Sequence, residues 1–255
     1  MKNLACLAAF AALAVADDDK LYISGQMQTK EKYTYGKFRG ACSGPGKKGT
    51  TVGFFTQWTG PNWDYTQWNS IEMEIVPSMA NPLSLDLSYG DGNTRIEYQN
   101  FQSGFQPTDQ EHVYEFTWSP NEVNFSVDDK LLKTYSKGNP GVDQQTKAQN
   151  IIFNMWAPRY DAHEDDWSAG RDDWDMPWYA SCDWIEYHAY DAASDSFSLT
   201  WRDDFDGDSI DMNRWEFANN STWDQDLAIY MDSQVYAWNG RAYLKMERIP
   251  SSFLQ

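Results

Sequence analysis

The sequence predicts an all-β protein, a two-sheet antiparallel β-sandwich. No helical period persists beyond residue 17, and short segments of alternating polar and apolar residues recur instead, separated by Gly, Pro, Asn and Asp. The clearest case is Asn239-Gly240 between the alternating segments 228–237 and 241–248, because Asn-Gly is a strong signal for a tight hairpin turn. A sandwich of this length usually buries one core, so we expect one domain.

The first residues have the features of a secretory signal peptide. Lys2 precedes an apolar run over 4–16 that is too short to span a bilayer, and the run ends in the small-x-small cleavage pattern AVA. We therefore expect residues 1–16 to be removed and the mature protein, starting near Asp17, to be secreted. No later apolar stretch is long enough for membrane insertion.

The remaining elements can be followed in order along the chain. Strands are expected at 33–41, 51–58, 68–78, 83–89, 95–99, 111–118, 122–127, 130–135, 150–156 and 178–190. The small polar stretch 191–196 (DAASDS) is typical of a joint, and strands at 197–205 and 214–217 and the hairpin follow it. These last strands are too few to bury a core of their own. We expect them to complete one domain over 17–249, with 250–255 as a tail.

The strand expected at 68–78 carries the candidate reactive groups. Because strand side chains alternate between faces, Ser70, Glu72 and Glu74 share one polar face. The apolar residues of the opposite face, which can enter a core, are Ile71, Met73 and Ile75. Two acids on one face repel each other, so a stable domain needs a reason to keep them. Paired carboxyl groups at a concave site are the equipment for cleaving glycosidic bonds.

Charge and aromatic content narrow the class of partner. The formal net charge of −18 argues against nucleic acid and anionic membranes, and favours neutral or cationic partners. Thirteen Trp, fifteen Tyr and thirteen Phe exceed what a core of this size needs. Most of them pack in that core, but the excess suggests platforms for sugar rings.

The cysteines and histidines give no metal site. After loss of the leader, Cys42 and Cys182 remain, either as one disulfide or as two free buried thiols. Neither has metal-binding spacing, the three His are scattered, and the acidic stretch 161–175 lacks the twelve-residue calcium-loop pattern. Three asparagines stand in N-glycosylation sequons, which matter only in a eukaryotic host: Asn124, Asn219 and Asn220.

Several segments together resemble glycoside hydrolase family 16. YGKF at 35–38 is similar to the family's Y-G-x-F strand, and 111–132 (EHVYEFTWSPNEVNFSVDDKLL) to its H-x-Y…W-x-P hairpin. Residues 153–156 and 184–190 also fit. The resemblance implies a concanavalin-like jelly roll in a secreted enzyme that cuts β-glucans, as lichenases cut mixed-linkage 1,3-1,4-β-glucan.

The order of the segments is unusual for this family. Residues 201–248 resemble the segment that is N-terminal in most members, but here it follows the joint at 191–196. This order resembles that of the naturally circularly permuted lichenases. A rotation of this kind is physically permissible, because the termini of a domain often lie close together.

The family's catalytic strand reads E-x-D-x-E, for nucleophile, supporting acid and acid/base. Laid on the apolar positions of this strand, the pattern implies that Glu74 is the acid/base and Glu72 the supporting carboxylate, while Ser70 holds the nucleophile position. A serine hydroxyl is a poor substitute without an activating base. Losing the nucleophile costs roughly 5 kcal/mol or more of barrier. The sequence therefore predicts a retained cleft with impaired hydrolysis.

Two hypotheses stand nearly equal. In one, Glu72 replaces the missing nucleophile, or holds a water for inversion, in an endo-β-glucanase. In the other, the protein is a carbohydrate-binding, lectin-like pseudoenzyme. A cell-surface structural role is a third class, and the intact leader argues against a deliberate serine replacement. The resemblance implies a monomer without a required cofactor, leaves a structural calcium open, and assigns the cleft to Trp58, Trp68, Asn154, Trp156, Trp167 and Trp223.

Overall fold

The computed structural model describes residues 20–249, except 62–63, 65, 103–105, 107–109, 160–166 and 168–169. The leader expected at 1–16 and the tail at 250–255 lie outside the described residues. No helix in the described part is long and apolar enough to cross a membrane.

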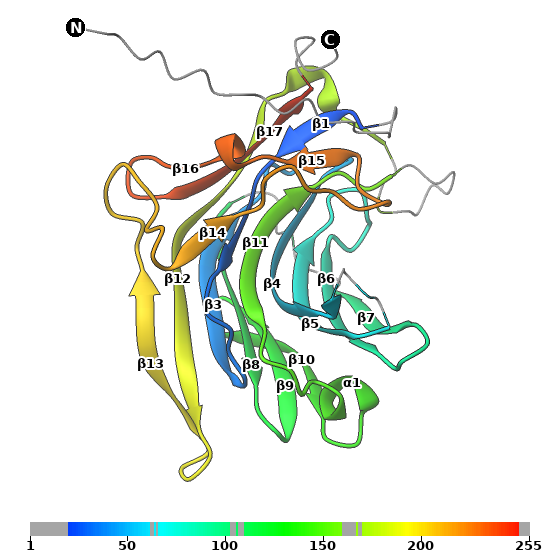
Figure 1. The fold of residues 1–255 in the computed structure, drawn as a ribbon, viewed down its shortest axis with the longest axis vertical. Coiled ribbons are helices and arrows are strands. Elements are labelled where there is room, and N and C mark those ends of the chain that lie inside the picture. The colour runs from blue at the N-terminus through cyan, green and yellow to red at the C-terminus, as the bar shows by residue number, and fades with distance from the viewer. Residues whose placement is uncertain are drawn as a thin grey trace, which may run out of the picture.

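Two β-sheets make up the described chain (Figure 1). The ten-stranded sheet has the order β10 (Lys130–Ser136), β9 (Glu122–Val127), β8 (His112–Trp118), β3 (Gly36–Ser43), β12 (Trp178–Asp191), β17 (Ala242–Arg248), β1 (Tyr22–Ser24) and β15 (Ala228–Tyr230), with β13 (Ser196–Asp203) beside β12 and β16 (Val235–Ala237) beside β17. The seven-stranded sheet has the order β14 (Trp215–Phe217), β2 (Gln26–Thr29), β11 (Asn150–Trp156), β4 (Thr51–Thr59), β5 (Trp68–Ile75), β6 (Leu83–Gly90) and β7 (Arg95–Gln102). Among these strands only β1 and β15 pair in parallel.

One hydrophobic core lies between the sheets. Side chains on the inward faces of both sheets, among them Phe38, Phe116, Phe153 and Trp215, are fully buried in it. Alternation creates this arrangement: β8 (HVYEFTW) buries every second residue, so one face of the strand enters the core and the other meets solvent. The strands that follow the joint add to both sheets, because β14 joins the seven-stranded sheet and β13, β15, β16 and β17 join the other.

A disulfide joins two neighbouring strands of the ten-stranded sheet. Cys42 of β3 and Cys182 of β12 are directly paired in the register, and their sulfur atoms are bonded. The disulfide alternative is therefore the one that the structure holds, and the free-thiol alternative is wrong.

Most predicted strands are present, and the expected turn at Asn239 and Gly240 is confirmed. Both residues have positive φ, 50° and 72°, as a type I′ turn requires. The continuous strand predicted at 228–237 is wrong. It divides into β15, a 3-10 turn (Asp232–Gln234) and β16, because β15 pairs with the outer edge of β1 and β16 pairs with β17. The strands β1 and β2 and the short helix α1 (Pro140–Asp143) were not predicted.

Candidate active site

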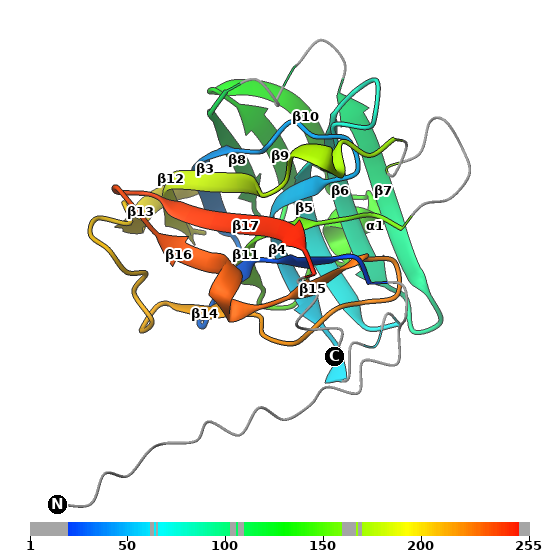
Figure 2. The same cartoon turned by 90° about the horizontal axis from the view of Figure 1, so that it is seen from above.

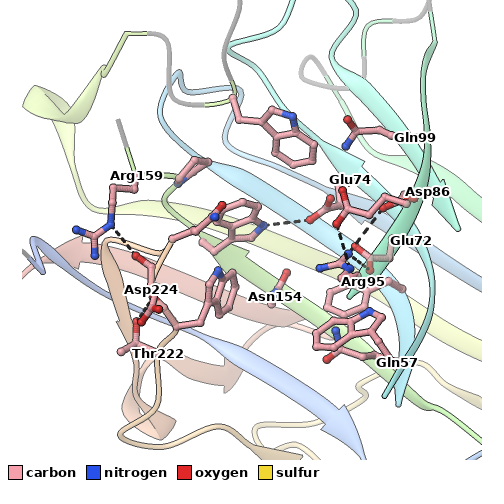
Figure 3. A pocket seen from close by; sticks show the side chains of 18 of the residues that line it. Gln57, Glu72, Glu74, Asp86, Arg95, Gln99, Asn154, Arg159, Thr222 and Asp224 are labelled. Atoms are coloured by element: carbon pink, nitrogen blue, oxygen red, sulfur yellow. Dashed lines mark hydrogen bonds and ion pairs between the residues drawn. The ribbon is translucent and has the colours of Figure 1, made fainter. Parts of the chain in front are cut away.

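A cleft of about 970 Å³ lies on the outward face of the seven-stranded sheet (Figure 3). Side chains from β4, β5, β6, β7 and β11 form its floor, and the loop before β15 forms a wall that carries Trp223. Figures 1 and 2 show β5, β6 and β7 side by side, which places the outward residues of three consecutive strands together. The cleft is therefore a property of the sheet register rather than of one strand.

Strand β5 has the predicted division between its two faces. Ile71, Met73 and Ile75 enter the core, while Glu72 and Glu74 line the cleft, each 7% exposed. Every residue of β5 is buried, because β4 and β6 flank the strand and the cleft walls cover its polar face. The two carboxyl groups are thus held out of bulk water, which makes their ionisation sensitive to each neighbour.

Ser70 lies behind the carboxyl groups and is fully buried. Its Oγ donates a hydrogen bond to Oε1 of Glu72 and accepts one of 2.9 Å from Nε1 of Trp68. The proton of the hydroxyl is therefore committed to Glu72. Trp68 contributes to the cleft as predicted, and it also fixes the orientation of the serine.

Arg95 is the cation at the centre of this cluster, and the sequence analysis missed it. Its Nη2 lies 3.2 Å from Oε1 of Glu72 and 3.8 Å from Oδ2 of Asp86, and its Nε lies 3.0 Å from Oε1 of Glu97. Its guanidinium stacks 4.6 Å from the ring centroid of Trp68. One half-buried arginine thus contacts the two buried acids Glu72 and Asp86 as well as the exposed Glu97, which partly offsets the cost of burying the first two.

Asp86 is a third buried acid that the sequence analysis missed. It lies directly opposite Glu72 in the pairing of β5 with β6, and it is 3% exposed (Figure 3). Its Oδ2 accepts a hydrogen bond of 2.9 Å from Ser88, whereas Oδ1 has no partner among the described residues. Burial, followed by the charge of Glu72, raises the pKa of Asp86 to about 7.

The environment divides the roles of Glu72 and Glu74. Burial, followed by the charge of Glu72, raises the pKa of Glu74 well above its usual range, although Nε1 of Trp156 donates a hydrogen bond of 3.1 Å to its Oε1. The raised pKa favours the protonated form of Glu74, which is the form that a general acid needs. Burial also raises the pKa of Glu72, but Arg95 and then the Ser70 hydroxyl oppose this rise. Of the two, Glu72 is the one that favours the carboxylate form.

Aromatic rings line the opposite side of the cleft. The ring of Trp156 lies 5.3 Å from that of Trp223 and 5.7 Å from that of Trp167, between centroids. Asn154 lies beneath them, and its Nδ2 donates a hydrogen bond of 3.2 Å to the hydroxyl of Tyr230. All four predicted residues line the cleft, where flat rings and an amide offer stacking and hydrogen bonds to a sugar.

Trp58 does not belong to the cleft lining that the structure describes. It follows Gln57, which does line the cleft, so strand alternation directs Trp58 to the opposite face of β4. There Lys147 lies over its ring at 5.3 Å. The prediction that Trp58 binds substrate is corrected accordingly.

The wall that carries Trp223 is anchored by two buried polar side chains, Lys20 and Asp226. Nζ of Lys20 donates hydrogen bonds to the carbonyl oxygens of Trp223 and Asp226. The Oδ1 of Asp226 accepts the backbone N–H groups of Ala157 and Ala228, at 3.0 and 2.8 Å. These bonds tie the end of β11 to the start of β15, and so set the position of the Trp223 loop. Sequence reasoning missed both Lys20 and Asp226.

The other candidate residues divide by exposure. Asn219 and Asn220 are exposed, whereas Asn124 is half-buried on β9 and its Nδ2 donates a hydrogen bond of 2.7 Å to Glu122. Among the described residues, no group of three or more His, Cys, Asp or Glu side chains could hold a metal ion. Calcium also accepts backbone and amide carbonyl oxygens as ligands, so a structural calcium stays an open expectation.

The model of the glycosyl hydrolases family 16 matches residues 9–184, which is more than half of the sequence. The chain belongs to glycosyl hydrolase family 16. This match includes the strand with Glu72 and Glu74 and ends before the joint at 191–196.

Curated relatives of this family 16 protein include several β-glucanases. The β-glucanase of Fibrobacter succinogenes is 25% identical over 252 residues, which cover 96% of this chain and 69% of that protein. The β-glucanase of Brevibacillus brevis is 24% identical over 167 residues, covering 65% of this chain and 60% of that protein. The matched region thus spans only about three fifths of the Brevibacillus enzyme.

Solved structures show the same fold. A glutamate-to-serine variant of LamA from Z. galactanivorans, in complex with laminaritriose and laminaritetraose, has a TM-score of 0.52 at 12% identity, covering 67% of this chain and 82% of that one. The laminarinase catalytic domain of Thermotoga maritima has a TM-score of 0.50 at 15% identity, and the match covers 68% of this chain and 81% of that one. The all-β sandwich predicted from the sequence is confirmed.

Proposed function

We propose that this family 16 protein binds β-glucan in the cleft and is an endo-β-glucanase whose hydrolysis is limited at the position of Ser70. One observation carries the proposal: Glu74, which is buried and has a raised pKa, faces a cleft walled by Trp156 and Trp223. A protonated carboxyl group and aromatic rings are what a glycosidic oxygen and pyranose rings require. The β-glucanase relatives support the same substrate class.

The slow reaction uses Glu74 as acid and Glu72 as the substitute carboxylate. Both described partners of Glu72, Ser70 and Arg95, bind its Oε1, so Oε2 is left for chemistry. Alternate residues of a strand are about 6.6 Å apart between Cα atoms, which suits the carboxyl separation of about 6.5–9.5 Å in inverting enzymes. Glu74 gives its proton to the leaving glycosidic oxygen, and Glu72 takes one from a water that attacks C1. The new reducing end then has inverted configuration, and solvent exchange restores both groups.

A lectin-like function is the second candidate, and the Arg95 contact favours it. An ion pair to Arg95 and the hydrogen bond from Ser70 both stabilise the Glu72 carboxylate. A stabilised carboxylate is a weaker base and a weaker nucleophile. In this case the cleft binds glucan without turnover. Failure to bind any soluble glycan would leave the cell-surface structural role.

Two measurements separate these functions. Isothermal titration calorimetry with mixed-linkage and 1,3-linked β-glucan oligosaccharides should show saturable binding, and binding of neither overturns both candidates. A reducing-sugar assay on lichenan and laminarin then reports turnover. Activity that Glu74→Gln abolishes identifies the acid, whereas activity that survives this change overturns its assignment. Ser70→Glu restores the family's nucleophile and should raise turnover by about 10³-fold or more.

We also propose that the segment order is circularly permuted. The alignment with the Fibrobacter β-glucanase extends over 96% of this chain, and the strands after the joint contribute to both sheets. A variant in which 197–249 precedes 20–190 should fold and bind the same oligosaccharides. Loss of folding in every linker length tried would contradict the permutation.

Secretion and a monomeric state remain proposals that rest on the leader sequence and the family resemblance. Mass spectrometry of the protein recovered from the medium of a secreting host should give an N-terminus near Asp17. Analytical ultracentrifugation should give the mass of one chain. A retained leader, or a stable dimer, would contradict the respective proposal.

A further inference from the structure

A group of exposed aromatic side chains lies on the outer face of the ten-stranded sheet, away from the cleft. Tyr179 of β12 is 42% exposed, Tyr236 of β16 is 36% exposed, and Trp238 in the following turn is 62% exposed. Half-buried Tyr243 of β17 lies among them. Large aromatics gathered in water are unusual on a monomeric protein and mark interaction surfaces.

The strand register places these rings on one face. Tyr236 is directly opposite Tyr243 in the pairing of β16 with β17, and Tyr243 is opposite Ser181 of β12. Tyr179 is two residues before Ser181 and therefore shares its face. The intervening residues of β17, such as Leu244, enter the core. Figure 2 shows β12, β17 and β16 side by side, so these rings form one surface. We call Tyr179, Tyr236, Trp238 and Tyr243 the outer aromatic platform.

The rings are close and partly aligned. The ring planes of Tyr236 and Tyr243 are within 13° of parallel, with centroids 5.5 Å apart, and Trp238 lies 6.1 Å from Tyr243. Burial, followed by the neighbouring Tyr179 and Tyr243, raises the pKa of Tyr236, so its phenol stays neutral. The platform therefore combines flat apolar faces with neutral hydroxyl groups, which is the pattern that stacks on a pyranose and hydrogen-bonds its hydroxyls.

The charges beside the platform are already paired within the protein. Nζ of Lys245 lies 2.6 Å from Glu247, and Arg241 forms ion pairs with Glu111 and Asp183. These two cations face three carboxylates, and Asp206 lies near Gly240 in the turn after Trp238. The described charges beside the platform therefore have no cationic excess that would select an acidic polymer. A neutral polysaccharide, with apolar ring faces and many hydroxyl groups, fits the flat rings and phenols of the platform.

The platform and the cleft lie on opposite outer faces of the sandwich. Glu72 and Glu74 point outward from the seven-stranded sheet, whereas the platform points outward from the ten-stranded sheet. A short oligosaccharide can occupy only one of them. A long polymer, or a particle of packed chains, presents many equivalent segments, so a second site raises the local concentration of substrate at the first.

We propose that the outer aromatic platform is a second binding site for neutral β-glucan polymer, separate from the cleft. The choice of glucan rests on the proposed function of the cleft, whereas the choice of a neutral polysaccharide rests on the platform itself. The platform holds the protein on insoluble or long-chain glucan, and the cleft binds single chains.

The test compares polymer and oligosaccharide binding. The double variant Tyr236→Ala/Trp238→Ala should bind insoluble β-1,3-glucan particles at least tenfold more weakly in a sedimentation assay, while its calorimetric affinity for a soluble β-glucan tetrasaccharide stays unchanged. Leu199→Ala removes another exposed apolar side chain, 56% exposed on β13, and should change neither affinity. Urea unfolding of each variant verifies that the fold is intact.

Each other outcome has a defined meaning. Unchanged particle binding in the double variant overturns the proposal that the platform binds glucan. The same conclusion holds if particle binding is unchanged and ultracentrifugation shows that these residues join two copies of the chain. The cleft variant Trp223→Ala should weaken tetrasaccharide binding and retain most particle binding. If wild type binds no tetrasaccharide but binds particles through Tyr236 and Trp238, the cleft function is wrong and the platform stands.

Discussion

Replacing Asp86 with asparagine measures the energetic cost of the acid cluster beneath the cleft. Asp86 is almost fully buried, and its Oδ1 has no hydrogen-bond partner among the described residues. Asparagine has nearly the same shape, and its amide oxygen can still accept the hydrogen bond from Ser88 that Oδ2 accepts now. The change therefore removes the ionisation of Asp86, together with the charge that lies 3.8 Å from Nη2 of Arg95.

The size of the effect follows from the pKa of Asp86. That pKa is about 7 in the folded protein, against 3.8 as the ordinary value, a difference of about three units. Between these two values the folded state holds a proton that the unfolded chain has lost, so the free energy of unfolding falls as the pH rises. Each unit is worth about 1.4 kcal/mol, which gives up to about 4 kcal/mol. The variant should match wild type near pH 4 and exceed its stability by up to this amount near pH 8.

Urea unfolding followed by tryptophan fluorescence, at one-unit steps from pH 4 to 8, gives this difference directly. Asp175→Asn is the control, because the pKa of Asp175 is shifted in the opposite direction to that of Asp86. Hydrogen bonds from Lys47 and then Trp178 lower the pKa of Asp175, so its ionised form already contributes its full stabilisation above pH 5. Between pH 5 and 8 the difference in free energy of unfolding between wild type and Asp175→Asn should therefore stay constant. A wild-type minus Asp86→Asn difference that does not change with pH would refute the reasoning, because Asp86 would then be ionised in both states.

Three further changes test the rest of the molecule. Trp156→Phe removes a hydrogen bond that lowers the pKa of Glu74, so the basic limb of the pH–kcat profile should move to higher pH, and an unmoved limb contradicts the acid assignment. Trp223→Ala should weaken tetrasaccharide binding about tenfold by calorimetry, and an equal affinity removes the ring from the site. Replacing both cysteines with alanine should lower the free energy of unfolding in urea by about 5 kcal/mol, since the bond closes a loop with a sequence separation of 140; an unchanged midpoint would contradict this.

Strands with one apolar and one polar face were predictable, because alternation records which face meets the core. Alternation predicted β5 correctly, since Ile71 and Met73 face inward and Glu72 faces the cleft. Alternation did not reveal β1 and β2, because their polar residues, among them Ser24 and Gln26, are buried as well. A strand that is buried on both faces has no alternation to read.

The reactive strand was predictable and its surroundings were not. Glu72 and Glu74 lie two residues apart, so local geometry alone places them together. Asp86 and Arg95 reach the same cluster from β6 and β7, and their place depends on strand register. The stretch 76–82 between β5 and β6 is longer than a tight turn, so the sequence leaves that register open. The prediction that Trp58 lines the cleft was wrong for a different reason. The strand was predicted correctly, but alternation places Trp58 on the face opposite to the cleft.

The position of β1 has a consequence for how the protein is made. Both neighbours of β1, the strands β15 and β17, come from the last part of the chain. During synthesis β1 therefore leaves the ribosome roughly two hundred residues before either partner exists. The strand with Glu72 and Glu74 can pair with β4 and β6 in the meantime, but the wall with Trp223 is still missing. A nascent or prematurely terminated chain thus has its acids without the wall that carries Trp223, so the proposed glucan binding requires a nearly complete chain.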